Sequence, residues 1–190
     1  MSTQPISRPS TFAAGADDIG LIIQALAFAA HKHRDQRRKD VKASPYINHP
    51  IAVAHVLYHE GGVSDARVIA AALLHDTIED TETHASEIER EFGKGICDIV
   101  LEVTDDTRLD KADRRRLQVE RSADASHSAR LVKLADKICN LRDMLNSPPA
   151  SWDLGRRREY FDWARQVMEQ IRGTNRRLEA VFDKVFARRP

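Results

Sequence analysis

The 190-residue chain lacks several features that mark special classes of protein. Its two cysteines, Cys97 and Cys139, are far apart and form no CxxC pattern, which argues against a disulfide framework and favours buried thiols in a reducing compartment. No run of about 18 apolar residues occurs, so no membrane-spanning helix is predicted. The 30 Lys and Arg residues balance 29 Asp and Glu residues, which leaves no overall attraction to nucleic acid or membranes.

The start of the chain, MSTQPISRPSTFAAGADD, lacks the apolar core of a secretory signal peptide. We therefore expect a cytoplasmic protein in which residues 1–16 form a flexible lead and residues 17–190 a single domain. Apolar residues make up 42% of the chain and charged residues 31%, which is typical of a globular protein with a sizeable core. The sequence makes no prediction of the oligomeric state.

Almost every segment has the spacing of an amphipathic helix. In residues 128–145 the apolar positions Leu131, Leu134, Ile138 and Leu141 recur every three or four residues. Helices are predicted over residues 17–32, 50–60, 65–76, 84–92, 94–106, 109–120, 128–145, 152–172 and 174–187, with Ser64 and Thr83 as N-caps and Pro50 as a first helical residue. Because no convincing pair of strands is present, the expected fold is an all-α bundle.

The stretch ALLHDTIEDT concentrates groups that bind metals and move protons at the end of an apolar helix. Glu79 lies four residues after His75 and three after Asp76, so helical geometry crowds these side chains together, and Asp80 follows directly. Three carboxylates in five residues repel one another unless a cation or solvent relieves them. A divalent metal would suit this position, and a polar helix end with ordinary surface acids is the alternative.

Two other parts of the chain carry side chains that can also bind a metal. Asp136 borders the apolar stripe of residues 128–145, with Lys133 one turn before it and Asn140 one turn after it. Taken alone, Asp136 is better explained as an acidic surface residue at the edge of the stripe. His49 directly precedes Pro50, which holds its backbone extended and sets its ring at the entrance of a helix.

Taken together, these places make the sequence resemble the metal-dependent HD phosphohydrolases, and more narrowly the hydrolase domain of RelA/SpoT-type proteins. The matching stretches are RRKD, PYINHPIAVAHVL, AALLHDTIEDT, EVTDD and LVKLADKICNLRDM, which lie in that order between Ile19 and Arg172. The resemblance implies an HD-domain helical bundle. The chain is too short for the synthetase domain and regulatory modules of that family, so it looks like a small free-standing alarmone hydrolase close to the short animal-type members.

The resemblance implies four metal ligands: His49, His75, Asp76 and Asp136. It also implies that Glu79 and Asp80 work on the attacking water. Two histidines and two carboxylates suit an octahedral ion with open positions, which indicates Mn²⁺ rather than tetrahedral Zn²⁺.

The family places the pair Arg38 and Lys39 over the nucleotide, so Arg38 is expected to stack on a purine and Lys39 to meet a phosphate or base edge. Asn140 is expected on the ribose or phosphate side. Tyr46 is expected either to line the pocket or to pack. The loop DVKAS, between Lys39 and Pro45, is longer than in many bacterial members, so the resemblance carries less about base recognition than about the metal site.

The predicted function is Mn²⁺-dependent hydrolysis of the 3′-pyrophosphate of guanosine 3′,5′-bispyrophosphate. One alternative is the same chemistry on another nucleotide that bears a ribose 2′- or 3′-phosphate. A second alternative is a protein that binds the nucleotide without cleaving it, which the intact Glu79 and Asp80 argue against. A nucleic-acid-binding module is the remotest possibility, because the basic residues form no stripe with interleaved aromatics.

Overall fold

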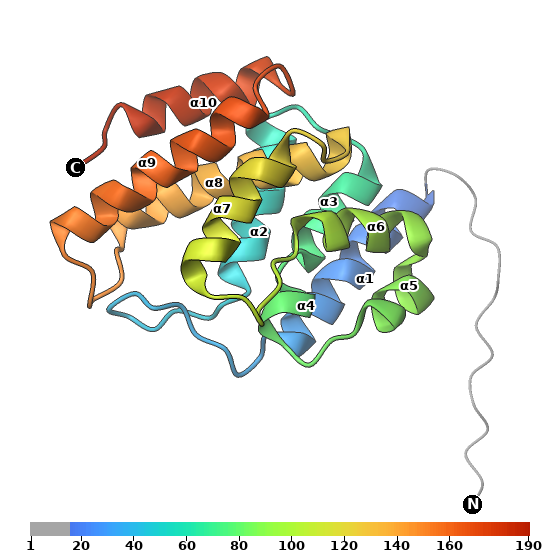
Figure 1. The fold of residues 1–190 in the computed structure, drawn as a ribbon. Helices are drawn as coiled ribbons and strands as arrows, with labels where there is room; N and C mark the ends of the chain where they lie inside the picture. Colours follow the sequence, from blue (N-terminus) through green and yellow to red (C-terminus); the bar gives the residue numbers. More distant parts are fainter. Residues whose placement is uncertain (1–15) are drawn as a thin grey trace, which may run out of the picture.

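The computed structural model describes residues 16–190, with side chains from residue 18 onward, and this part of the chain is all-α (Figure 1). Within residues 16–190 there is no strand, only an isolated bridge between Arg37 and Pro45. The predicted lead, residues 1–16, lies outside the described residues except for Ala16, which begins the first helix. The helices are α1 (Ala16–Lys32), α2 (Asn48–His55), the π-helix η1 (Val56–Glu60), α3 (Ala66–Leu74), α4 (Thr77–Asp80), α5 (Ala85–Phe92), α6 (Lys94–Val103), α7 (Lys111–Ser122), α8 (His127–Asn146), α9 (Leu154–Gln170) and α10 (Arg176–Phe186).

The N-caps of α3 and α5 differ from the predicted ones. The α3 cap is Asp65, not Ser64: its backbone is extended, and its carboxylate accepts a hydrogen bond from the N–H of Arg67 at 2.9 Å. Aspartate and serine cap equally well, so composition does not choose between neighbours. His84 precedes α5, while the hydroxyl of Thr83 is 2.7 Å from that of Thr81.

Other helix boundaries were also predicted wrongly. α2 begins at Asn48, before Pro50, which sits within the first turn where its missing N–H costs nothing. The predicted helix over 65–76 ends at Leu74, and the separate short helix α4 follows from Thr77. The hydroxyl of Thr77 donates to the carbonyl of Leu74 at 2.7 Å, which satisfies a carbonyl that the break in the helix leaves free.

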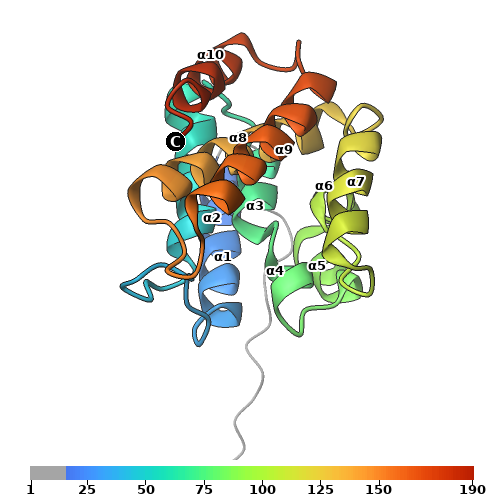
Figure 2. The same ribbon diagram turned by 60° about the vertical axis from the view of Figure 1, so that its left-hand side comes forward.

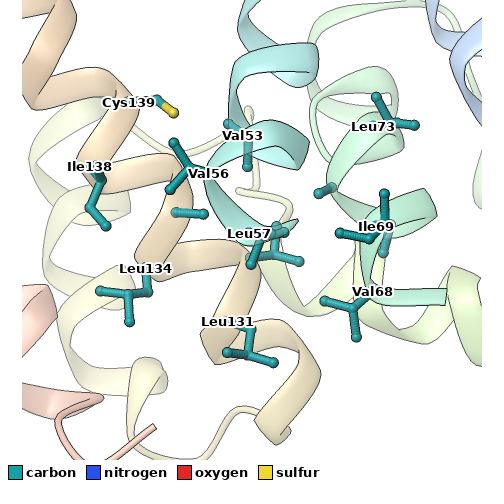
Figure 3. Packing of buried hydrophobic residues seen from close by; sticks show 14 of the residues in the cluster. Val53, Val56, Leu57, Val68, Ile69, Leu73, Leu131, Leu134, Ile138 and Cys139 are labelled. Atoms are coloured by element: carbon teal, nitrogen blue, oxygen red, sulfur yellow. The ribbon is translucent and has the colours of Figure 1, made fainter. Parts of the chain in front are cut away.

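The core is built around α3 and α8. Eight of the nine residues of α3 are buried, as expected for a helix that is apolar on all sides. In Figure 3, Ile69 of α3 lies near Leu57, with Leu134 and Ile138 projecting from α8. The buried cluster contains side chains from both helices, so neither can shift without opening a cavity.

The remaining helices surround this pair. α1 and α6 pack on α3, with α5 against α6, while α9 and α10 pack on α8 and α7 packs on α9 (Figures 1 and 2). α2 contacts both α3 and α8. The C-terminal end of α3, the start of α2 and the middle of α8 therefore meet, and each carries a candidate site residue. No helix of residues 16–190 combines the length and apolar character needed to cross a bilayer.

Candidate active site

His75 and Asp76 occupy the break between α3 and α4. His75 is the C-cap of α3, and its Nδ1 lies 2.8 Å from the carbonyl of Ala72, so Nδ1 carries a proton and Nε2 is the nitrogen left to face a metal. The buried run that ends at Leu74 fixes the helix end, and hence the ring. His75 Nε2 therefore has a defined direction, and it can bind a metal once it releases its proton.

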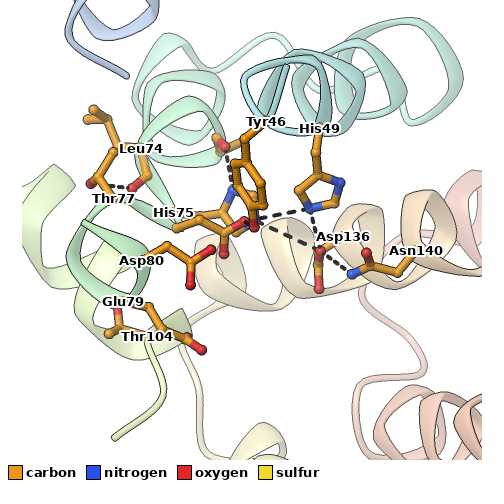
Figure 4. Close-up of polar contacts among 12 residues, drawn as sticks. Tyr46, His49, Leu74, His75, Thr77, Glu79, Asp80, Thr104, Asp136 and Asn140 are labelled. Atoms are coloured by element: carbon orange, nitrogen blue, oxygen red, sulfur yellow. Dashed lines mark hydrogen bonds and ion pairs between the residues drawn. The ribbon is translucent and has the colours of Figure 1, made fainter. Parts of the chain in front are cut away.

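His49 and Asp136 complete the cluster from distant parts of the chain (Figure 4). His49, in the first turn of α2, lies with Nε2 3.1 Å from Asp136 Oδ1 and 3.7 Å from Asp76 Oδ2. His75 Nε2 lies 3.0 Å from Asp76 Oδ2 and 3.8 Å from Asp136 Oδ1. Ligand atoms of His49, His75 and Asp136 all lie within 4.8 Å of one another. The fold thus brings together the four metal ligands that the family resemblance implies: His49, His75, Asp76 and Asp136.

This donor set fits a divalent cation. His75 Nε2 is buried and has no hydrogen-bond partner among the described residues, although a carboxylate oxygen of Asp76 is near. Burial lowers the pKa of His75, but the charges of Asp76 and Asp136 outweigh burial and raise it to about 9. Burial raises the pKa of Asp136, and Lys137 and His49 then lower it well below its usual value. Burial also raises the pKa of Asp76, but the charges of His75 and His49 outweigh it and lower that pKa, so both carboxylates remain ionised, as metal ligands must be.

Neighbouring side chains orient the two carboxylates. The hydroxyl of Tyr46 donates to Asp76 Oδ2 at 2.7 Å. Burial, followed by the charges of Asp76 and Asp80, raises the pKa of Tyr46, so its hydroxyl remains a donor. Asn140 donates to Asp136 Oδ1 at 2.6 Å and Lys137 donates to Asp136 Oδ2 at 3.0 Å. Such contacts fix the orientation of metal ligands and tune their basicity.

Glu79 lies beside the cluster on α4, at the edge of a cavity of about 190 Å³ that the cluster lines. Its carboxylate accepts a hydrogen bond from the N–H of Asp105 at 3.0 Å and lies 3.5 Å from Arg114 Nη1. Burial raises the pKa of Glu79; the Asp105 N–H opposes this, and the charges of Asp105, Asp76 and Asp80 add to it. The resulting pKa is about 7, which suits a group that exchanges protons near neutral pH.

Asp80 is exposed, and its carboxylate is hydrogen-bonded by the segment that follows α1. The amide of Gln36 donates to Asp80 Oδ2 at 3.0 Å, and its oxygen lies 2.5 Å from Nδ1 of His33. His33 is buried and stacks on Tyr46, with ring centroids 4.9 Å apart. The carboxylate requires a donor, so the amide nitrogen faces Asp80 and the amide oxygen faces His33. The sequence prediction did not include Gln36.

The basic loop borders a second, larger cleft of about 440 Å³. Arg38 pairs with Asp143, and its guanidinium lies 5.4 Å from the centroid of the Tyr46 ring. Lys39 is exposed on the wall of the cleft. The N–H of Arg38 donates to Ser44 O at 2.8 Å, so the longer loop folds back on itself. Arg38 is thus held in place by side chains of the protein.

Aromatic and amide side chains connect the cleft with the 190 Å³ cavity lined by His49, His75, Asp76 and Asp136. Tyr46, His49, Asn140 and Tyr160 line both spaces. Trp152 and Trp163, which the sequence indicates as core residues, are half-buried against the core, and each also lines one of these spaces. The sequence prediction missed Tyr160, because its spacing on α9 is that of an ordinary core residue.

Comparison with known proteins assigns the chain to a class. Residues 25–161 match the HD domain family, so this is an HD-domain protein. Over 171 residues, 90% of this chain and 96% of the relative, it is 52% identical to guanosine-3′,5′-bis(diphosphate) 3′-pyrophosphohydrolase MESH1 of Xenopus tropicalis. It is also 52% identical to the Homo sapiens MESH1 over 168 residues, 88% of this chain and 94% of that protein.

A solved structure gives the same result. It belongs to a metazoan ortholog of SpoT described as hydrolysing ppGpp and playing a role in starvation responses. The two chains are 44% identical and align with a TM-score of 0.87, over 95% of this chain and 98% of the other. The chain therefore belongs to the MESH1 family of HD-domain proteins, which confirms the resemblance to short animal-type relatives of RelA and SpoT.

Proposed function

We propose that this chain hydrolyses the 3′-pyrophosphate of guanosine 3′,5′-bispyrophosphate, ppGpp or pppGpp, to GDP or GTP and pyrophosphate, with Mn²⁺ as its metal. The observation that carries the proposal is the convergence of two imidazoles and two carboxylates beside Glu79, whose pKa is about 7. The MESH1 proteins carry this activity in their names, and the similarity extends over nearly the whole of both chains.

The metal would be held by His49, His75, Asp76 and Asp136. The site offers two nitrogen and two oxygen donors and no cysteine. This donor set favours Mn²⁺ over Zn²⁺, which thiolate-rich sites select. When bound, the ion would polarise a phosphate oxygen and lower the pKa of a water molecule. Tyr46, Asn140 and Lys137 keep the carboxylates oriented.

Glu79 and Asp80 serve the attacking water. Glu79 accepts a proton from the water, which its pKa allows near neutral pH, and Asp80 orients the water. The water oxygen forms a bond to the phosphorus attached to the ribose, and the bond between that phosphorus and the ribose 3′-oxygen breaks. The 3′-oxygen takes up a proton, so the products are the nucleoside 5′-diphosphate or 5′-triphosphate and pyrophosphate.

The nucleoside would occupy the 440 Å³ cleft, where Arg38 and Lys39 form one wall and Trp152 and Tyr160 lie among the other lining residues. Asn140, on the boundary between cleft and cavity, would lie on the ribose and phosphate side. A guanosine polyphosphate is thus the only partner we propose. A cytoplasmic location and the absence of nucleic-acid and membrane partners remain predictions.

The test is steady-state hydrolysis by metal-stripped protein, supplied in turn with Mn²⁺, Mg²⁺ and Zn²⁺. The substrates are ppGpp and nucleotides that carry a single ribose 2′- or 3′-phosphate. We expect turnover of ppGpp with Mn²⁺ and release of pyrophosphate. Asp136→Asn should lose bound metal, whereas Asp80→Asn should keep it and lose about 10²–10⁴-fold in kcat. Asp98→Asn, at an exposed carboxylate paired with Lys94, is the matched control. Turnover of the single phosphates but not of ppGpp would refute the proposal.

A further inference from the structure

Lys133 is a buried ammonium group next to the candidate metal site, and no described side chain forms a hydrogen bond or ion pair with it. It lies on α8 three residues before Asp136, so the two side chains share a helix face. Its exposed fraction is 8%. Among residues 16–190, no acceptor lies within hydrogen-bond or ion-pair distance of its Nζ, whereas Lys137 is bonded to Asp136 at 3.0 Å. Burying an unpaired charge is costly, so the fold tolerates Lys133 at the expense of stability.

Lys133 lies where two cavities meet. It lines the 190 Å³ cavity of the candidate metal site and also a neighbouring cavity of about 300 Å³ bordered by α6, α7 and α8. Gln118 is the other residue common to both. Arg114 lines the neighbouring cavity too, and its Nε is buried without a hydrogen-bond partner. Two cationic side chains therefore have unused donors around this space.

The acidic side chains of the neighbouring cavity form no ion pair with Lys133, although the charges of Asp105 and Glu102 act to raise its pKa. Glu102 accepts a hydrogen bond from the N–H of Ser126, and Asp105 accepts one from the amide of Gln118. Asp106 forms a bidentate pair with Arg108, and the fourth acid, Asp124, is exposed. Burial and the charge of Lys137 lower the pKa of Lys133 to about 8 against the opposing charges of Asp105, Asp136 and Glu102, so it is still protonated at neutral pH. Lys133 therefore keeps a positive charge and unused donors on the wall of both cavities.

The order of the three spaces defines what reaches Lys133. The nucleoside cleft joins the metal cavity through Tyr46, His49, Asn140 and Tyr160, and Lys133 is not among the residues of the cleft. The metal cavity therefore lies between the cleft and Lys133. We place the nucleoside in the cleft and the attacked phosphorus beside the four candidate metal ligands. A second phosphate linked to that phosphorus then extends toward Lys133.

We propose that Lys133 binds the terminal phosphate of a ribose 3′-diphosphate, the one beyond the phosphorus that water attacks. Lys133 then makes the site selective for 3′-diphosphates over 3′-monophosphates. This inference rests on the proposed function, because it takes the scissile phosphate to lie at the metal cluster.

The test compares two guanosine 5′-diphosphates that differ only in the terminal phosphate at the 3′ position. The 3′-diphosphate is the substrate and the 3′-monophosphate a competitive inhibitor in the same assay, with Mn²⁺ in excess. Lys133→Met removes the charge and keeps the length of the side chain. It should raise KM for the diphosphate about tenfold or more, the scale of one charge-assisted hydrogen bond, and change Ki for the monophosphate less than about twofold. Lys133→Arg should restore most of the loss.

Two controls separate binding from structure. Lys184→Met, at an exposed lysine on α10, makes the same change in net charge away from the cavities and should leave both constants unchanged. Lys133→Met should melt at the same or a higher temperature than the wild type, because an unpaired buried charge is removed; a structural lysine would show the opposite. Equal losses on the two nucleotides, or no loss on either, would overturn the role of Lys133. Wild-type protein without turnover of the 3′-diphosphate would instead overturn the proposed function.

Discussion

Replacement of Glu79 by glutamine should stabilise the metal-free protein while it abolishes most of the activity. The Glu79 side chain is 21% exposed. Burial chiefly raises its pKa, and despite the opposing N–H of Asp105 the value rises from 4.5 to about 7. The folded state thus binds this proton more tightly than the unfolded state, so ionisation of Glu79 weakens the fold as pH rises above 4.5, and the full cost is present above about pH 7.

The size of the effect follows from the pKa. Each pKa unit corresponds to about 1.4 kcal/mol, so the charged carboxylate costs the folded protein about 3 kcal/mol at pH 8 and below about 1 kcal/mol at pH 5. Glutamine still accepts the hydrogen bond from Asp105 but loses the contact with Arg114 at 3.5 Å, which is worth up to about 1 kcal/mol. The net gain is about 2–3 kcal/mol at pH 8, or about 4–12 °C in Tm for a chain of this size.

The assay is thermal unfolding in the presence of a chelator at pH 8 and pH 5, with turnover measured separately in Mn²⁺. Glu79→Gln should raise Tm at pH 8, most of that gain should vanish at pH 5, and kcat should fall about 10²–10⁴-fold. Glu82→Gln, at an exposed glutamate two residues after α4, serves as the control and should change neither quantity. A Glu79→Gln protein that melts at or below the wild-type temperature at pH 8 would show that the carboxylate is not destabilised as its surroundings imply.

Two further predictions concern the segment after α1. Gln36→Ala should lower kcat about two- to tenfold, because the amide that orients Asp80 is lost, and should have almost no effect in an Asp80→Asn background; full additivity would separate the two residues. Arg38→Ala should raise KM for the guanine nucleotide about tenfold and raise it less for a phosphorylated ribose without a base, since a cation over a ring contributes about 1–2 kcal/mol. Equal losses on both compounds would mean that Arg38, held by Asp143 and Tyr46, does not contact the base.

The sequence by itself determined the class of fold and predicted which residues form the candidate site. Helical periodicity is local, since it depends on residues three and four apart, and it therefore predicted most helices, including α8 to within a residue at each end. His75, Asp76, Glu79 and Asp80 are likewise neighbours in the chain, so their crowding was visible without coordinates. The sequence did not show which of two similar neighbouring residues caps a helix, since Asp65 and not Ser64 caps α3.

Only the tertiary structure decided which distant groups meet. His49 and Asp136 are 87 residues apart, and their 3.1 Å contact exists because α2 and α8 pack against each other and α3. The contact of Gln36 with Asp80 and the position of Lys133 between two cavities also arise from packing. No spacing in the sequence encodes these relations. A cavity is the space that side chains from several helices leave between them, and its lining depends on the whole bundle.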